Sequence, residues 1–425
     1  MDKFDVVIVG GGLAGLAAGY VLAKAGLETV LIERGDYPGA KNVTGGRLYV
    51  NPVKKYLPDI WEDAPLERPI TTEIVTMMAQ DTSTTMRFRA DKFAKEPQSY
   101  SVLRATFDRW LGEKAEEAGV ALITKNNVDE IIMENGRVIG VVAGGDELGA
   151  DVVIAADGVL SLTAEKAGLR LPGKPMHHAV GFKEVLELPA KTIEDRFGLP
   201  EGEGAAQLFM GGVTAGKFGG GFLYTNKNSL SLGVVVGIKD LMQGGVKAPD
   251  LLEDFKRRPE IAPLIDGAEL VEYSGHVIPE GGMDGLTKPV GSGILVAGDA
   301  AGFSMNMGVT VRGMEFALAS GVLAAQAIIE AKHVNDFSAA GLSVYKKMLD
   351  QSFVMKDFQT FKHAPHVLEN PRMFNHYPQF AGGILEDLFT ITDQPKAKLS
   401  DTVKKHLSFG EMIKMAKDAW GGLKI

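Results

Sequence analysis

The first 33 residues carry the pattern that most restricts what this chain can fold into. An apolar, β-branched run, FDVVIV at 4–9, leads through glycines into the helical stretch LAGLAAGYVLAKAG, and a second apolar run then ends at Glu33. Gly10, Gly12 and Gly15 satisfy G-x-G-x-x-G, which permits a tight turn, a close approach of backbone to pyrophosphate, and a helix lying against the strand. Glu33 stands where a carboxylate can bind a ribose diol. The pattern predicts a βαβ dinucleotide site; the alternative is a βαβ unit with a merely tight turn.

Two later strands also end in a glycine turn that carries an aspartate. DVVIAADG ends at Asp157 and Gly158, and GILVAGDAAG places Gly298 and Asp299 ahead of a long apolar helix. A carboxylate at such a corner can contact a ribityl hydroxyl, and the N-terminus of a following helix favours phosphate or an anionic ring. Nicotinamide has no ribityl chain. The three corners are therefore typical of FAD-dependent proteins with the glutathione reductase or p-hydroxybenzoate hydroxylase flavin fold, unless all three are coincidental strand–glycine turns.

Composition excludes several other classes of protein. With a net charge of -9 the chain has no overall excess of basic residues, so we expect no nucleic-acid partner. The chain has no cysteine, which excludes disulfides and any all-cysteine iron–sulfur cluster held by this chain alone. The N-terminus shows no secretory pattern, and we expect a cytoplasmic protein. The apolar stretch from Gly313 to Lys332 includes Glu315, Gln326 and Glu330, which favours a buried helix over a membrane span.

The hydropathy pattern of the sequence changes after residue 176. Residues 177–275 alternate in hydropathy and predict an antiparallel sheet, with a helical insertion at DLLEDFKRRPEIAPLI. The glycine-rich stretch GAAQLFMGGVTAGKFGGGF at 204–222 either admits a lipophilic quinone or a bilayer interface, or forms core. We expect no metal site: His363 and His366 make H-x-x-H, but Pro365 breaks the helix that would align them.

The sequence thus predicts an α/β chain in three parts. A discontinuous Rossmann-like FAD-binding domain takes 1–75, 100–176 and 276–340, and an antiparallel-sheet quinone or substrate domain takes 76–99 and 177–275. A helical C-terminal region, 341–425, is expected to dock partners. Its tail is rich in lysine, which is either a solvated face or a surface for an acidic partner or lipid headgroups.

Four segments together resemble, over nearly the whole chain, the FixC-type branch of the electron transfer flavoprotein-quinone oxidoreductase family. They are VIVGGGLAGLAAGYVLAKAGLETVLIERGDYPGAKNVTGGRLY at 8–49, LRATFDRWL at 103–111, ADGVLS at 156–161 and GDAAGFSMNMGVTVRGMEFALASG at 298–321. KNVTGGRLY is the most specific of them. In flavoproteins of this type the arginine at the start of the second segment, here Arg104, approaches the FAD diphosphate or ring; a surface salt bridge is the alternative. Val128 falls where such families hold adenine with backbone atoms.

The KNVTGGRLY segment follows the second strand's acid, so it must cross the carboxyl edge of the sheet, where an isoalloxazine would lie. Gly45 and Gly46 allow backbone to pass against the ring with free amides. Lys41 or Arg47 is placed to stabilise an anionic reduced flavin. Met307, Gly308 and Val309 are expected to present amides from the other side. The alternative is a solvated glycine turn with ordinary surface cations.

These inferences give one set of expected FAD contacts and no catalytic residue. The expected contacts are Gly10, Gly12, Leu13, Ala14, Gly15, Glu33, Arg34, Lys41, Thr44, Gly45, Gly46, Arg47, Arg104, Val128, Ala156, Asp157, Gly158, Gly298, Asp299, Met307, Gly308 and Val309.

The resemblance implies the FAD subunit of an electron transfer flavoprotein:quinone oxidoreductase, in an electron-transferring or electron-bifurcating complex. Its implied partners are the α and β subunits of electron transfer flavoprotein, a small ferredoxin-like iron–sulfur subunit of the FixX type, and quinone. The missing cysteines imply that the iron–sulfur cluster sits in that separate subunit. The implied location is the inner face of the cytoplasmic membrane, in peripheral contact. The alternative function is that of a geranylgeranyl-reductase-like flavoprotein, whose relatives commonly bear a cysteine near the flavin.

Overall fold

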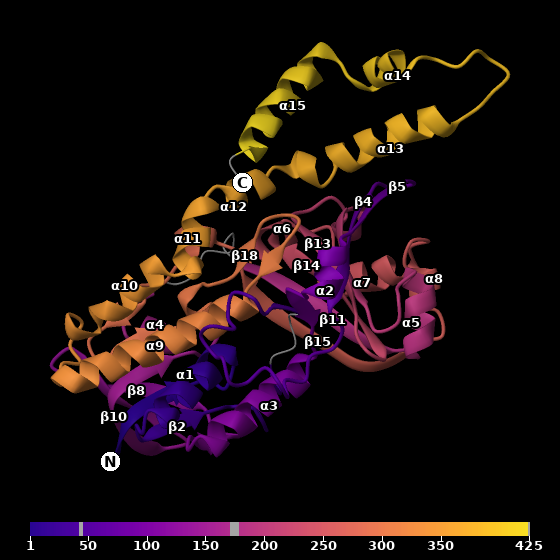
Figure 1. Cartoon of the computed structure of the whole chain (residues 1–425). Helices are drawn as coiled ribbons and strands as arrows, with labels where there is room; N and C mark the ends of the chain where they lie inside the picture. The colour runs from indigo at the N-terminus through magenta and orange to yellow at the C-terminus, as the bar shows by residue number, and fades with distance from the viewer. Residues whose placement is uncertain (42–45, 171–177, 424–425) are drawn as a thin grey trace.

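A computed structural model describes residues 1–41, 46–170 and 178–423 of the chain. One lobe holds the N-terminus and a mainly parallel sheet, a second lobe holds a mainly antiparallel sheet, and a helical arm extends from the body near the C-terminus (Figure 1). Each lobe has its own apolar core cluster of buried side chains.

The first sheet is built around five parallel strands. Among the described residues its order is β16-β17-β10-β1-β2-β7, and β9 and β8 continue antiparallel from β10. The strands are β1 Asp2–Val9, β2 Thr29–Ile32, β7 Ala121–Ile123, β8 Val128–Glu134, β9 Arg137–Ala143, β10 Asp146–Ala155, β16 Val290–Gly291 and β17 Ile294–Val296. The β8–β9 turn at Asn135 and Gly136 has positive φ at both residues, as is usual for an Asn-Gly hairpin turn.

Helices α1 Leu13–Lys24, α3 Arg104–Glu117 and α9 Met314–Val334 pack in this lobe, with the short α4 Leu162–Lys166 near β8. α9 is long and apolar enough to cross a membrane, yet 83% of its most apolar window is buried inside the protein. The expected buried helix is confirmed. Its fit against α1 is close, because a Cβ at Gly321 would lie 2.1 Å from the Ala14 carbonyl oxygen.

The second sheet covers the first lobe's carboxyl edge and is antiparallel except at one pair. Its order in the described chain is β15-β11-β14-β13-β12-β4-β5, and β12 runs parallel to β4. The strands are β4 Ile70–Met78, β5 Ser83–Arg89, β11 His178–Glu187, β12 Gly204–Gly211, β13 Gly219–Thr225, β14 Ser229–Gly237 and β15 Glu269–Pro279. Two short ribbons pair β3 Arg47–Tyr49 with β6 Ser99–Ser101, and β18 Met305–Asn306 with β19 Val311–Arg312.

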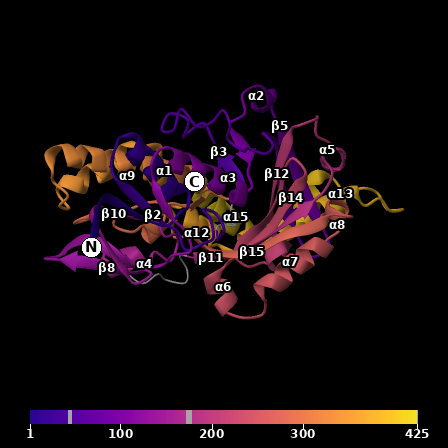
Figure 2. The same ribbon diagram turned by 90° about the horizontal axis from the view of Figure 1, so that it is seen from below.

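Five short helices accompany this sheet in the described chain. They are α2 Asp91–Lys95, α5 Ala190–Phe197, α6 Ile238–Met242, α7 Ala248–Arg257 and α8 Ala262–Ile265. α6 and α7 lie against β11 and β14 (Figure 2). α7 and α8 occupy the predicted helical insertion.

The glycine-rich stretch becomes strands β12 and β13 and the turn between them. Phe209 is buried in the core cluster under α7, where its ring lies 4.9 Å from that of Phe255, whereas Leu208 and Phe222 are half-buried on the opposite face. The core interpretation is therefore confirmed for Phe209.

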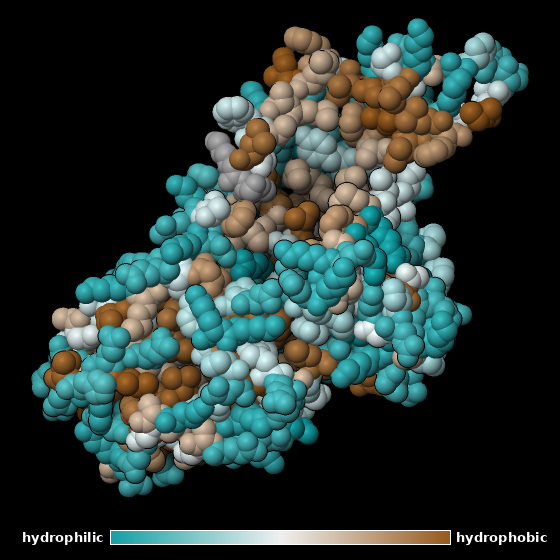
Figure 3. All heavy atoms as spheres, in the orientation of Figure 1, coloured by the Kyte–Doolittle hydropathy of each residue, from teal (hydrophilic) through white to brown (hydrophobic). Residues whose placement is uncertain are grey.

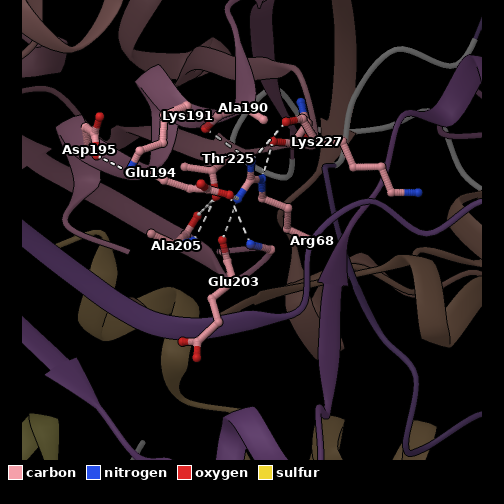
Figure 4. A network of polar contacts seen from close by, with 12 residues as sticks. Arg68, Ala190, Lys191, Glu194, Asp195, Glu203, Ala205, Thr225 and Lys227 are labelled. Carbon is pink, nitrogen blue, oxygen red and sulfur yellow. Dashed lines mark hydrogen bonds and ion pairs between the residues drawn. The ribbon is translucent and has the colours of Figure 1, made fainter. Parts of the chain in front are cut away.

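A buried arginine joins the segment before β4 to helix α5 and to two turns of the second lobe. The Arg68 side chain is 3% exposed, and its Nη1 lies 2.8 Å from Oε1 of Glu194 and 2.9 Å from the carbonyl oxygen of Glu203. Its Nε donates to the carbonyl of Asn226 at 2.6 Å and its Nη2 to that of Lys227 at 3.0 Å (Figure 4). Arg68 thus satisfies several carbonyls that the turns leave without strand partners.

The C-terminal part is helical, as predicted. It comprises α10 Val344–Gln351, α11 Phe353–Thr360, α12 Ala364–Leu368, α13 His376–Phe389, α14 Leu399–His406 and α15 Phe409–Gly422. We call residues 376–423 the arm. Arg372 holds it to the body through Glu411, 2.8 Å away, and Asp418, also 2.8 Å away.

Three predicted boundaries cut through strands, and the one between 99 and 100 falls inside the short β6. β4 spans the boundary between 75 and 76, and β15 spans the one between 275 and 276. Because β4 pairs along its length with β12 and β15 with β11, each strand belongs whole to the second sheet.

Candidate cofactor site

A large cavity of about 660 Å³ lies at the carboxyl edge of the parallel strands. Its lining draws on all three predicted corners of the first lobe and on β11, β13 and β15 of the second. Its volume is in the range of sites for cofactor-sized ligands.

The first corner is formed by tight backbone contacts around the G-x-G-x-x-G glycines. Gly10 has φ +105°, and a Cβ there would lie 2.4 Å from the Ala156 carbonyl oxygen. At Gly15 a Cβ would lie 2.1 Å from the Gly10 carbonyl oxygen, so α1 rests directly on the turn. Gly12 is the N-cap residue of α1, and it lines the cavity together with Leu13 and Ala14. The N-terminal amides of α1 thus stand where a pyrophosphate can accept from them.

Glu33 ends β2 at this corner and is 7% exposed. One carboxylate oxygen accepts from the Gly11 amide at 2.7 Å and the other from the Gly35 amide at 2.6 Å. These bonds fix the carboxylate at the cavity wall, where its remaining lone pairs can accept from a diol. Arg34, beside it, also lines the cavity.

The second corner is held by Asp157. Its Oδ1 accepts from the Ser161 hydroxyl at 3.1 Å, and its Oδ2 accepts from the Thr163 amide at 3.0 Å. Ala156, Asp157 and Gly158 all line the cavity.

The third corner carries the most perturbed carboxyl of the lining. The Gly298 amide donates to the Ser320 hydroxyl of α9 at 3.0 Å, which anchors the turn before Asp299. Burial raises the pKa of Asp299 to about 6, and the charge of Arg104 acts in the opposite direction.

Arg104 lines the cavity wall with a largely buried side chain, and its ion pair with Asp108 lies inside the protein. Its side chain is 12% exposed and its Nη2 lies 2.7 Å from Oδ2 of the fully buried Asp108, one helical turn on. Burial, together with the charges of Arg104 and Arg34, lowers the pKa of His276 on β15 to about 4. His276 is therefore neutral at pH 7.

The two cations predicted beside the isoalloxazine, Lys41 and Arg47, differ in burial and in pairing. Both line the cavity, but Arg47 is 9% exposed and its Nη1 donates to Oε2 of Glu73 at 2.8 Å, whereas Lys41 is exposed. Thr44 and Gly45 lie outside the described residues. Gly46 lines the cavity, and a Cβ there would meet Cδ2 of Tyr224 at 2.7 Å. The bare backbone at 46 thus makes room for an aromatic ring from β13.

Residues 307–309, which are expected to present amides to the flavin, are not among the described residues that line this cavity. Met307, Gly308 and Val309 belong to the turn between β18 and β19, and Val309 is 61% exposed. The described lining instead includes Ser304 and residues 311–314. The turn projects because β18 and β19 pair as a hairpin and carry its tip outward.

Arg312 is one of several lining residues that sequence reasoning missed. Its Nε lies 2.6 Å from Oε1 of Glu315 and its Nη1 lies 2.5 Å from Oδ2 of Asp357. Val128, which was predicted, lines the cavity at the start of β8. The other missed residues include Asn126, Asn127, Tyr224 and His276. Only Asn126 and Asn127 gave a signal in the sequence, as polar residues directly before Val128, the predicted adenine contact.

Comparisons with known proteins agree with this geometry. Residues 5–167 match the model of the FAD dependent oxidoreductase family, and residues 364–425 match that of the ETF-QO/FixC family C-terminal domain. The protein FixC of Escherichia coli O157:H7 is 47% identical over 425 residues, which cover 100% of this chain and 99% of that protein. The chain belongs to the ETF-QO/FixC family. It is an FAD-dependent oxidoreductase of the electron transfer flavoprotein-quinone oxidoreductase type and binds FAD.

Other members of the family are nearly as similar. A probable electron transfer flavoprotein-quinone oxidoreductase of Escherichia coli K12 is 44% identical over 422 residues, covering 99% of this chain and 98% of that protein. The FixC protein of Azotobacter vinelandii is 41% identical over 95% of this chain and 94% of its own length.

Solved structures share the fold at low identity. A geranylgeranyl bacteriochlorophyll reductase-like protein of Thermoplasma acidophilum superposes with TM-score 0.74 and 20% identity, over 98% of this chain and 99% of that one. A flavin-dependent brominase superposes with TM-score 0.62 and 18% identity, over 97% and 100%. At such identities the likeness shows the fold alone, and the predicted flavin fold with a helical C-terminal region is confirmed.

Proposed function

We propose that this chain accepts electrons that originate in an electron transfer flavoprotein and passes them to quinone. The observation that carries the proposal is the 44% identity, over 99% of the chain, to a protein named as a probable electron transfer flavoprotein-quinone oxidoreductase. FAD supplies the redox chemistry, since it exchanges electrons both singly and in pairs.

The cavity walls support specific roles toward FAD. The amides at the start of α1 bind the pyrophosphate, and Glu33 orients the ribose at the end of β2. Asp157 and Asp299 meet the ribityl chain and the ring end, with Lys41 and Arg104 supplying positive charge. Backbone near Val128 holds the adenine. Gly46 and Tyr224 form the wall contributed by both lobes.

A small ferredoxin-like iron–sulfur subunit completes the proposed complex. The chain has no cysteine, so an iron–sulfur cluster ligated by cysteine thiolates must come from another chain. We place its docking on the helical C-terminal region.

The arm supports peripheral contact with the membrane that holds quinone. Apolar side chains gather over it (Figure 3). The strongly exposed ones are Phe389, Ile391, Leu399, Phe409, Met412, Ile413, Trp420 and Leu423. The arm has six lysines and six acidic residues and is formally neutral, whereas the whole chain carries -9. Apolar and aromatic side chains of this kind enter the headgroup region of a bilayer.

The test is a reconstituted electron-transfer assay. The FAD-loaded chain is mixed with reduced electron transfer flavoprotein, with and without the small iron–sulfur subunit, and reduction of a soluble quinone analogue is followed. We expect quinol formation only when all components are present. Absence of quinol together with hydrogenation of a geranylgeranyl substrate would assign the chain to the reductase alternative.

A further inference from the structure

Arg312 lines the large cavity and is held between two carboxyl groups. Its side chain is 13% exposed. Its Nε donates to Oε1 of Glu315, 2.6 Å away on α9, and its Nη1 donates to Oδ2 of Asp357, 2.5 Å away on α11. Glu315 is buried and the Asp357 side chain is 28% exposed. We call these three residues the Arg312 triad.

The triad differs in charge from the other ion pairs of the described cavity wall. Arg47 pairs with Glu73, and Arg104 pairs with Asp108, in both cases through two guanidinium nitrogens. Each of these pairs is formally neutral. The triad joins one cation to two carboxyl groups and is not neutral when both are ionised. Its charge therefore acts on a ligand in this part of the cavity.

Two contacts place Arg312 at the end of the cavity where the isoalloxazine is expected. Its guanidinium carbon lies 5.9 Å from the ring centre of Tyr49, the last residue of β3 and of the KNVTGGRLY segment. Arg312 also stands two residues before α9, whose Ser320 hydroxyl accepts from the Gly298 amide at the third corner. It thus lies between the two elements that were expected to approach the ring.

The guanidinium group keeps one nitrogen for a ligand. Glu315 and Asp357 engage Nε and Nη1, and Nη2 makes no hydrogen bond to another described residue. The rings of Phe316 and Phe353 have their centres 4.5 Å and 5.8 Å from the guanidinium carbon, so apolar groups cover it on that side. A donor fixed in such surroundings interacts strongly with charge that develops nearby.

We propose that the Arg312 triad sets the reduction potential of the bound FAD, with Nη2 of Arg312 donating to the oxygen-bearing edge of the isoalloxazine. This inference requires FAD binding and is independent of the electron donor and of quinone as the acceptor. Oxidised FAD takes up two electrons and one proton to give the anionic reduced form, so the ring gains one negative charge. Arg312 stabilises that charge, whereas the carboxylate of Asp357 opposes it.

The test is an anaerobic titration of the FAD-loaded protein with dithionite and a reference dye, followed by visible absorbance. In Arg312→Gln we expect the ratio of reduced to oxidised FAD at a fixed potential to fall at least about tenfold, a shift of about 30 mV for a two-electron couple. Asp357→Asn should shift the ratio in the opposite direction. Arg312→Gln/Asp357→Asn, in which the two charge changes cancel, should return to within about threefold of the wild type.

Two matched controls change the same residue types at positions that do not line the described cavity. Arg258→Gln removes a 22% exposed arginine that pairs with Glu260, and Asp350→Asn neutralises a 39% exposed carboxylate that pairs with Lys346 on α10. Both should keep the wild-type potential. Arg312→Lys retains the charge at the site and should stay closer to the wild type than Arg312→Gln does.

Affinity for FAD gives a readout independent of turnover. The potential of bound FAD depends on the ratio of its affinities in the oxidised and reduced forms. Arg312→Gln should therefore weaken binding of reduced FAD at least about tenfold more than binding of oxidised FAD. Tryptophan fluorescence of the FAD-free proteins, titrated with each form, measures both affinities.

A wild-type potential in Arg312→Gln would overturn this inference and leave the proposed function standing. Shifts of the same sign in Arg312→Gln and Asp357→Asn would overturn it as well. If Arg312→Gln does not fold, Asp357→Asn decides, because its target is half-buried and only an upward shift of the potential agrees with the charge assignment.

Discussion

Asp299 shows how single residues of the cavity set its chemistry and its stability. Its pKa is about 6 in the folded chain, against 3.8 for an ordinary aspartate. The folded state therefore binds this proton more tightly than the unfolded state does. Below about pH 4 both states are protonated; between about pH 4 and 6 the unfolded state loses the proton that the folded state keeps, so the free energy of unfolding falls and then levels off above about pH 6.

Replacing Asp299 by Asn should therefore stabilise the FAD-free protein at neutral pH. We expect a gain of about 1–2 kcal/mol at pH 7.5, which disappears below about pH 4. Chemical denaturation across this pH range measures it. Glu116→Gln, which neutralises an exposed acid of α3, should show no such trend. A less stable Asp299→Asn protein at pH 7.5 would contradict the assigned cause.

The sequence predicted those site residues whose role depends on the backbone. Glycine corners and strand-end acids are local patterns, and the structure brings Gly10, Asp157 and Asp299 to one cavity. The environments of Arg47 and Arg104 were not predictable in the same way. Arg47 is neutralised by Glu73, which comes from a strand of the other lobe, and no spacing in the sequence encodes that meeting.

At the scale of elements, the parallel pairing of β4 with β12 sets how the lobes are joined. Alternating hydropathy predicted strands in the second region but carries no information about strand direction, so the parallel pair was not predicted. Arg68 stands just before β4 and ties its entry to the turns of the second lobe.

Replacing Arg68 by Met should destabilise the second lobe strongly. The change leaves the Glu194 carboxylate, 8% exposed, without its cation, and removing one partner of a buried ion pair costs about 3–5 kcal/mol. Urea unfolding followed by circular dichroism measures this loss. Arg89→Met removes a 37% exposed arginine that pairs with Glu203 and should cost under about 1 kcal/mol. Equal effects of the two changes would contradict the special position of Arg68.

At the scale of the whole molecule, the arm carries the largest group of exposed apolar side chains among the described residues. Changing Phe409 and Trp420, 77% and 70% exposed, to Ser should weaken binding to anionic vesicles at least about tenfold, because each loses about 1.5–3 kcal/mol of apolar burial. Vesicle flotation measures the bound fraction. Met242→Ser, which changes a 71% exposed residue on α6, is the control. Undiminished flotation of the double variant would place the contact elsewhere.

The strand order of the first sheet has a consequence for biosynthesis. β1 lies between β2 and β10, and β10 is flanked in turn by β17, which ends at Val296. The ribosome must therefore synthesise the chain as far as β17 before all the strands around the N-terminal glycine turn are present. Coenzyme uptake is then a late event, and nascent chains released short of β17 should emerge colourless.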